Sequence, residues 1–134
     1  MDMEVRFPGN KRVDAYHNGF TIQTDQHKDE GGEGSAPEPF TLFLASIGTC
    51  AGIYVLSFCQ QRGISAENLA LRLSFDWNEK THHMDTIRIQ IDLPTEFPPK
   101  YQKAVVKAAQ MCTVKRHLEN PPNFEVNTRI LAPL

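Results

Sequence analysis

Twenty consecutive residues, from Phe40 to Cys59, carry no charged side chain. A stretch this long and apolar is typical of a transmembrane helix, and Gly48 and Gly52 have the spacing of a helix-packing motif. Hydroxyl side chains inside the stretch and an acidic segment before it favour a soluble helix instead. We therefore expect a helix that is apolar on all sides and is enclosed either by a sheet or by a partner subunit.

The rest of the composition predicts one globular domain over residues 1–134. The chain has 40% hydrophobic and 22% charged residues, with a formal net charge of -2. No basic stripe alternates with aromatic residues, so we expect no nucleic-acid partner, and the soluble pattern of the whole predicts no membrane association. The start of the chain lacks the pattern of a secretory signal, and the cysteines are too few for a disulfide framework, which predicts a cytoplasmic protein with reduced thiols.

Strand-like patterns precede the apolar stretch. Residues 11–17 and 19–24 alternate between apolar and polar side chains, and an Asn-Gly pair joins them. Because both positions of a tight hairpin turn need a positive φ, this pair predicts a hairpin. Residues 3–7 suit a third short strand, and the polar, glycine-rich residues 26–36 suit an exposed, mobile loop.

Two further strands and a second helix are predicted after the apolar helix, which should end near Gly63. Apolar side chains alternate with polar ones over 69–77 and 87–93, so one face of this sheet should be buried. Over residues 100–112, an apolar stripe of helical period ends at Cys112 and therefore places this cysteine on a buried face.

A short helix over 114–119 and a closing strand over 124–131 complete the predicted order β-β-β-α-β-β-α-α-β. No internal repeat interrupts this order. The expected fold class is therefore α+β, with antiparallel sheets wrapped around the long buried central helix.

The cysteines are the main candidates for chemistry. If the apolar helix is continuous, Cys50 and Cys59 lie nine residues apart, roughly 180° around its axis, so they cannot share one site. We expect Cys59 to be a structural core residue, because cysteine is among the most buried residue types. Cys50 lies among small residues, where a substrate or a partner side chain could approach its sulfur.

Cys112 lies where one predicted helix ends and the next begins. Unpaired backbone N–H groups at a helix start, and the positive end of the helix dipole, stabilise a thiolate. The alternative is that Cys112 is a small hydrophobic residue on the buried stripe of its helix.

Other ligand sites are not indicated. The adjacent residues His82 and His83 would point to opposite faces of a strand, so they are poor joint ligands for a metal ion shared with His117. The chain has no glycine-rich phosphate loop, serine-centred elbow or zinc-binding cysteine motif. We therefore expect neither a metal nor a cofactor.

Two sequence motifs resemble those of a known family. They are Ala45-Ser46-Ile47-Gly48-Thr49-Cys50-Ala51-Gly52, preceded by Pro39, and Met111-Cys112-Thr113-Val114-Lys115-Arg116. Together with the predicted order of strands and helices, they are similar to the OsmC/Ohr superfamily of osmotically inducible and organic-hydroperoxide-resistance proteins. The resemblance implies an intertwined homodimer whose central helices pack together, which would account for the apolarity of the long helix.

The resemblance also implies thiol-dependent peroxidase chemistry. Cys50 matches the family's peroxidatic cysteine, and Cys112 matches its resolving cysteine. The Cys50 thiolate would attack an organic hydroperoxide, become a sulfenic acid and then form a disulfide with Cys112. A cellular thiol or dithiol would reduce this disulfide.

The sequence departs from the family at the groups that activate the thiol. Active family members supply an arginine from the first strands and a glutamate directly after the proline that begins the helix. Here Phe40 and Thr41 follow that proline. The candidates for these parts are Arg12, with Arg6 as the second choice, and Glu38, which lies on the other side of the proline. Their alternative roles are those of solvated strand residues and of an exposed acid near a helix N-terminus.

Two functional classes stay open at this point. The first is an enzyme, a peroxidase that uses Cys50 and Cys112 and protects against oxidative stress. The second is a binding or sensing dimer without the activating pair, whose cleft takes a small apolar or thiol-reactive ligand. A lowered pKa of Cys50 would favour the first class, and an unreactive Cys50 beside a ligand-sized cleft would favour the second.

Overall fold

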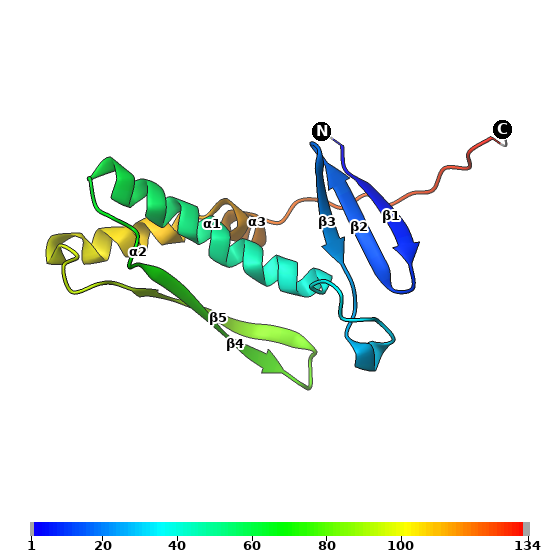
Figure 1. Ribbon diagram of the computed structural model, residues 1–134, viewed down its shortest axis with the longest axis horizontal. Coiled ribbons are helices and arrows are strands. Elements are labelled where there is room, and N and C mark those ends of the chain that lie inside the picture. Colours follow the sequence, from blue (N-terminus) through cyan, green and yellow to red (C-terminus); the bar gives the residue numbers. More distant parts are fainter. Residues whose placement is uncertain (1, 133–134) are drawn as a thin grey trace. The chain divides into compact units, whose positions relative to one another are not determined.

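The computed structural model describes residues 2–132 and has the predicted mixed α+β architecture (Figure 1). Three strands precede a long helix, and a pair of strands and two shorter helices follow it. The elements are β1 (Glu4–Gly9), β2 (Arg12–His17), β3 (Phe20–Thr24), the 3-10 turn η1 (Lys28–Glu30), α1 (Pro39–Gln61), β4 (Ala70–Asn78), β5 (His83–Asp92), the 3-10 turn η2 (Pro99–Tyr101), α2 (Gln102–Gln110) and α3 (Thr113–Glu119).

The chain divides into two compact units. One contains the chain up to Thr49 together with Leu73–Ile89, and the other contains Cys50–Arg72 together with the chain from Gln90 onward. The first unit holds the sheet of β1, β2 and β3, and the second holds α2 and α3. Helix α1 and the strands β4 and β5 contribute residues to both units, so the single domain over residues 1–134 stays a prediction.

The first sheet is an antiparallel meander in the order β1-β2-β3. His17 pairs with Phe20 across the β2–β3 turn, and the turn residues Asn18 and Gly19 have φ angles of 49° and 78°. The hairpin that the Asn-Gly pair predicts is therefore confirmed. The predicted third strand is confirmed as β1, which pairs with β2.

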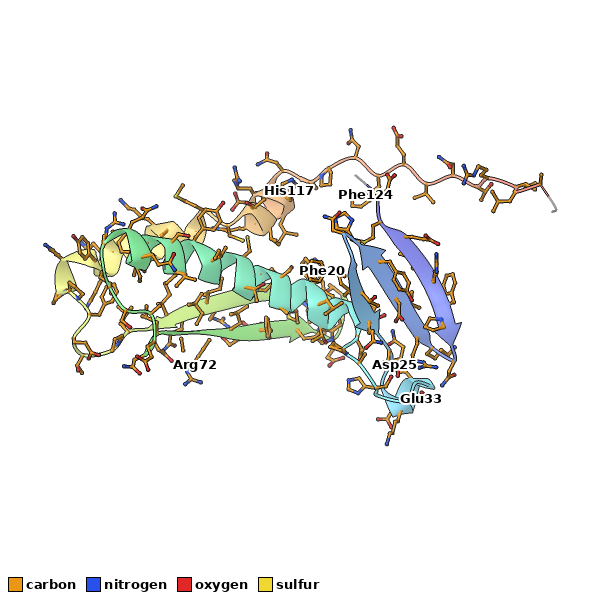
Figure 2. The ribbon with its side chains drawn as sticks, turned by 45° about the horizontal axis from the view of Figure 1, so that its top comes forward. Phe20, Asp25, Glu33, Arg72, His117 and Phe124 are labelled. Carbon is orange, nitrogen blue, oxygen red and sulfur yellow. The ribbon has the colours of Figure 1, made fainter. Side chains whose placement is uncertain are left out.

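A buried carboxylate organises the loop between β3 and α1. Asp25 has no exposed surface, and its side chain accepts hydrogen bonds from the backbone N–H groups of Gln26, Glu33 and Ser35 at 2.8, 3.3 and 3.0 Å. The Ser35 hydroxyl donates a further bond to the same carboxylate at 2.6 Å. Figure 2 shows Asp25 and Glu33 near each other in this part of the chain. Most of the loop is exposed, as the sequence predicts, but Asp25 ties both of its ends together.

Helix α1 spans the uncharged stretch and ends where the sequence predicts. Gly63 has a φ of 65°, and its N–H donates to the Gln60 carbonyl at 3.3 Å. The Ile64 N–H donates to the Cys59 carbonyl at 2.9 Å. These two bonds around a left-handed glycine form a Schellman motif, which satisfies carbonyls at the helix end.

Within residues 2–132, α1 is enclosed on only part of its surface. Phe40 and Ile53 are 45% and 53% exposed. Among the described residues, α1 is the one helix whose length and composition would allow it to cross a membrane, with a mean hydropathy of 1.9 and 28% of its most apolar window buried. The expected enclosure on every side is therefore incomplete within one copy of the chain. The buried residues of α1 are Ile47, Ala51, Val55, Phe58 and Cys59.

Strands β4 and β5 form a two-stranded sheet with the predicted alternation. Gly48 of α1 lies against this sheet, and a Cβ at Gly48 would be 3.1 Å from Leu73 Cδ1. The missing side chain therefore allows helix and strand to approach closely. Leu73 is half-buried, but Phe75 and Trp77 are 38% and 46% exposed, so the face expected to be buried is covered only in part.

The amphipathic stripe that leads to Cys112 is confirmed. Val105, Ala109 and Cys112 are 0%, 8% and 2% exposed, whereas the lysines of α2 lie on the surface. The helix predicted over 100–112 is shorter, because η2 precedes α2, and α2 ends at Gln110 with Met111 as its C-cap. Cys112 is instead the N-cap residue of α3.

The closing strand predicted over 124–131 is wrong. No strand forms between residues 121 and 132 of the described chain, and Phe124, Val126 and Ile130 are 84%, 95% and 96% exposed (Figure 1). Alternating apolar residues give this segment the pattern of a strand, but a strand also needs a neighbour for its backbone hydrogen bonds. The segment pairs with none of the described strands.

Candidate functional site

Cys50 and Cys112 meet where α1 and α3 come together. Cys50 lies in the middle of α1 and is partly exposed, whereas Cys112 is 2% exposed. Both are free thiols, and they lie close enough for each to shift the pKa of the other. Two neighbouring thiols, one of which solvent can reach, can be joined in a disulfide by a two-electron oxidant, and an external thiol can reduce that disulfide by exchange.

Local structure explains the position of Cys112. The buried stripe of α2, with Val105 and Ala109, continues to Cys112, where the backbone becomes extended with a ψ of 129°. The Cys112 sulfur accepts a hydrogen bond from the Lys115 N–H at 3.4 Å. The Cys112 sulfur therefore takes the place of the side-chain oxygen that usually caps a helix. This hydrogen bond fixes the direction of the Cys112 side chain.

The surroundings of Cys50 favour its thiolate. The Val114 N–H donates to the Cys50 sulfur and is the main cause that lowers the pKa of Cys50. Partial burial acts against this, while the Cys112 thiol, the Thr113 N–H and the charge of Arg116 lower the pKa further. Because the thiolate is the nucleophile, these groups make Cys50 more reactive than an ordinary thiol.

Cys112 is perturbed in the opposite direction. Burial is the main cause that raises the pKa of Cys112, and the Lys115 N–H offsets part of this effect. Its hydrogen bond to Cys50 and the negative charge of a Cys50 thiolate raise the pKa further. As the pH rises, Cys50 therefore loses its proton first, and Cys112 remains a thiol beside it.

A chain of polar side chains adjoins the cysteine pair. Tyr54 Oη and Thr113 Oγ1 are 3.1 Å apart, and Arg116 Nη2 donates to the same Thr113 oxygen at 3.2 Å. Tyr54 follows Cys50 by one helical turn, and Thr113 follows Cys112 directly, so this chain borders the same helix contact as the thiols. Arg116 is part of the second sequence motif but has no predicted role in the site. Tyr54 is not among the predicted site residues, although its spacing of one helical turn from Cys50 is a signal that could have identified it.

Cys59 lies apart from this pair, in the core. It has no exposed surface, and burial is the main cause that raises its pKa, with the charge of Arg62 in partial opposition. Arg62 is itself engaged, because its guanidinium lies 3.7 Å from the centre of the Phe58 ring and donates to the Phe58 carbonyl at 3.1 Å. A buried thiol with a raised pKa is a poor nucleophile, which suits the structural role expected for Cys59.

The arginine and glutamate candidates have local surroundings of their own. Arg12, at the start of β2, is exposed and forms no ion pair within residues 2–132. Glu38 precedes α1, and its carboxylate lies 2.6 Å from His27 Nε2. Arg6 pairs with Glu4 at 2.7 Å. Arg12 and Glu38 therefore form no ion pair with each other in the described part of the chain.

Each of the histidines considered as metal ligands has local surroundings of its own. His82 lies in the β4–β5 turn with a φ of 52°, and His83 Nδ1 lies 3.7 Å from Asp85. His117 Nδ1 lies 2.8 Å from the Thr113 carbonyl oxygen. Within residues 2–132, no group of three or more side chains of the metal-binding types gathers at one place.

Comparison with known proteins bears on both cysteine motifs. The sequence profile of the family described as OsmC-like protein matches residues 32–127, a range that includes Cys50 and Cys112. No curated protein matches the chain.

Solved structures share the fold. A Psychrobacter arcticus protein, described as an osmotic stress induced and detoxification response protein, has a TM-score of 0.73 at 22% identity, with 85% of each chain covered. An OsmC like protein from Mycoplasma pneumoniae has a TM-score of 0.70 at 12% identity, over 90% of this chain and 87% of that one. An organic hydroperoxide resistance protein from Legionella pneumophila has a TM-score of 0.53 at 18% identity, with 87% of each chain covered. At these identities the likeness concerns the fold alone.

Proposed function

Because the chain belongs to the OsmC-like protein family, we propose that it reduces organic hydroperoxides, with Cys50 as the attacking thiolate and Cys112 as the resolving thiol. The family, and the hydroperoxide resistance proteins that share the fold, support a redox or peroxide-related role. The observation that carries the finer assignment is the contact between two thiols whose pKa values are shifted in opposite directions.

The first step transfers one oxygen atom to sulfur. The Cys50 thiolate attacks the distal oxygen of the hydroperoxide, so that an S–O bond forms while the O–O bond breaks. The organic part leaves as an alkoxide, takes up a proton from solvent and becomes an alcohol. Cys50 has then lost two electrons and is a sulfenic acid.

The second step closes a disulfide. Cys112 loses its proton and attacks the Cys50 sulfur, so that an S–S bond forms while the S–O bond breaks, and the hydroxide leaves as water with that proton. The proximity of the two thiols supports this step, because the resolving sulfur is already next to the oxidised one. A cellular thiol or dithiol supplies two electrons and restores both thiols by exchange.

The surroundings of Cys50 support an organic substrate. Helix α1 has no charged side chain from Pro39 to Gln61, and the neighbours of Cys50 on its exposed side include Ile53. An alkyl or aryl group gains free energy by leaving water for such a surface, whereas hydrogen peroxide has no apolar part to place there.

We also propose that the protein acts as a homodimer. Ile53 on α1 is exposed, and a second copy of the same helix would cover it. The alternating residues Phe124, Val126 and Ile130 are also exposed, although they have the pattern of a strand. A sheet edge of the second copy would supply the neighbour that this segment lacks among the described residues.

A non-catalytic role is the second candidate. Phe40 and Thr41 stand where the resemblance implies a glutamate, and Glu38 is paired with His27. Without an activating arginine–glutamate pair, the dimer would bind or sense a small apolar or thiol-reactive ligand at the partly exposed Cys50. The lowered pKa of Cys50 favours the peroxidase over this alternative.

Cumene hydroperoxide, added in equal amount to the reduced protein, distinguishes the two roles. We expect rapid loss of the Cys50 and Cys112 thiols, with peptide mass spectrometry locating one disulfide between them and Cys59 still reduced. Slow oxidation spread over all the cysteines would contradict the peroxidase proposal and would favour the ligand-binding role.

A further inference from the structure

The polar chain beside the cysteine pair bears on how Cys50 is activated, and the inference drawn from it rests on the proposed function of Cys50 as the attacking thiolate. We call Tyr54, Thr113 and Arg116 the Thr113 cluster, because the Thr113 hydroxyl joins the other two side chains. Tyr54 comes from α1, whereas Thr113 and Arg116 come from α3. The cluster therefore links the same two elements that bring the thiols together.

Hydrogen bonds link Arg116 to α1 through the hydroxyl of Thr113. Arg116 Nη2 donates to Thr113 Oγ1 at 3.2 Å. A threonine hydroxyl can accept this bond and still donate its own hydrogen, so it can bond at the same time to Tyr54 Oη, which is 3.1 Å away. Arg116 is therefore tied to the helix contact that contains Cys50, although α3 itself lies on the surface.

Among the lysine and arginine side chains of α3, Arg116 is the one without an ion pair in the described part of the chain. Its neighbour Lys115 lies 3.6 Å from Glu119, and His117 is bonded to the Thr113 carbonyl at 2.8 Å. Helix α1 has no charged side chain, and the charged side chains of α2 are lysines. Glu119 is therefore the only carboxylate on these three helices, and within residues 2–132 Arg116 forms no ion pair.

We propose that Arg116, positioned by the hydroxyls of Thr113 and Tyr54, supplies the positive charge that stabilises the Cys50 thiolate in this protein. It takes the part that the resemblance gives to an arginine of the first strands, for which Arg12 was the candidate. A guanidinium stays charged at every pH at which a thiol titrates, so its effect on Cys50 does not depend on its own protonation. Thr113 and Tyr54 are positioning residues, since they act on Cys50 through Arg116.

The test measures the thiolate of Cys50 without any peroxide. Reduced full-length protein is alkylated with iodoacetamide over a series of pH values, and peptide mass spectrometry follows the rate at Cys50. Arg116→Gln should move the alkylation profile to higher pH and slow the reaction at neutral pH by roughly three- to tenfold. Lys115→Gln removes the same charge from the next position and is the matched control, which should leave the profile unchanged.

Variants of the positioning residues separate charge from packing. Tyr54→Phe and Thr113→Val should move the profile in the same direction by a smaller amount, and neither should add to the effect of Arg116→Gln in a double variant. Arg116→Lys should restore part of the rate, because lysine keeps the charge but lacks the planar fork that bonds to Thr113. If Arg116→Gln fails to fold, Arg116→Lys and Tyr54→Phe carry the test.

The outcomes distinguish this inference from the peroxidase proposal. Identical alkylation profiles for the wild type, Arg116→Gln and Lys115→Gln would overturn the role of Arg116, even if cumene hydroperoxide is consumed rapidly. A profile that depends on Arg116 in a protein that does not consume the hydroperoxide would support the role of Arg116 and contradict the peroxidase proposal.

Discussion

The thiols of Cys50, in α1, and Cys112, at the start of α3, are neighbours, and each shifts the pKa of the other. The pKa of Cys50 is lowered, mainly by the Val114 N–H, and the pKa of Cys112 is raised, mainly by burial. Over a range of pH the pair therefore holds one proton, and that proton belongs to Cys112. This asymmetry supports the proposal that Cys50 attacks the hydroperoxide and that Cys112 acts in the second step.

Selective alkylation follows from this asymmetry. As the pH rises from acid to neutral, iodoacetamide should react first at Cys50, because its thiolate forms first and is partly exposed. Cys112 should react only at higher pH, and Cys59, which has no exposed surface, only when the protein unfolds. Peptide mass spectrometry at each pH measures the order, and labelling of Cys112 before Cys50 would contradict the assignment.

Single cysteine variants should separate the two steps. Cys50→Ser should abolish turnover of cumene hydroperoxide, since a serine hydroxyl is not ionised at neutral pH. Cys112→Ser should allow one oxidation and then stop, because no thiol is left to close the disulfide. Dimedone, which reacts with sulfenic acids, should then label Cys50 in Cys112→Ser but not in the wild type.

Cys59→Ser is the matched control for these variants. It should keep full turnover, and its free energy of unfolding should fall by about 1–3 kcal/mol, because the hydroxyl would be buried in an apolar core. A folded Cys59→Ser protein without turnover would show that the assignment of Cys50 and Cys112 is incomplete.

Periodicity and charge account for most of the helices and strands. The absence of charge from Phe40 to Cys59 predicts α1, and Gly63 predicts its end. The stripe with Val105 and Ala109 predicts the buried position of Cys112. These predictions succeed because each depends on one segment and on the surface that this segment must bury.

The contact between Cys50 and Cys112 could not be derived in this way. The helical stripe shows that Cys112 is buried, but not which side of α1 it meets. The angle between Cys50 and Cys59 shows only that the two lie on different sides of α1, so that no single site includes both. The position of Cys112 next to Cys50 depends on the turn between α2 and α3. A periodic pattern of apolar residues does not predict the direction of such a turn.

The structure differs from the sequence-based predictions in two further places, and the two differences have separate causes. The residues 124–131 have the pattern of a strand, but pairing depends on a neighbour that one segment cannot specify. Asp25 is buried in a loop where polar composition predicts exposure, because four hydrogen bonds replace its contacts with water. A side chain whose hydrogen bonds come from backbone groups elsewhere in a loop is not revealed by any periodic pattern in the sequence.

Asp25 should give the stability of its loop a dependence on pH. Hydrogen bonds from the Ser35 hydroxyl, from the Ser35 and Gln26 N–H groups and from the Glu33 N–H lower the pKa of Asp25 to about 2, against the effect of burial. Because this value lies below the ordinary 3.8, the contribution of Asp25 to stability is complete above pH 3.8 and is lost as the pH falls through about 2.

Urea unfolding of Asp25→Asn measures this contribution. The variant should have a lower urea midpoint than the wild type at neutral pH, and the difference should shrink as the pH falls from 3.8 to about 2. Asp29→Asn, in the same loop but exposed, is the matched control and should keep the wild-type midpoint. Equal midpoints for Asp25→Asn and Asp29→Asn would show that the Asp25 hydrogen bonds do not stabilise the fold.

The uncovered side of α1 predicts which substitution separates the proposed dimer. Ile53, on α1, is 53% exposed, so Ile53→Glu would place an unpaired charge in a contact between two copies of the helix and should raise the dissociation constant roughly tenfold or more. Val106 on α2 is 46% exposed, and Val106→Glu is the matched control that should leave the constant unchanged. Sedimentation equilibrium of the full chain measures both. A wild-type monomer at micromolar concentration would contradict the dimer, and equal constants for the two variants would exclude this side of α1 as its interface.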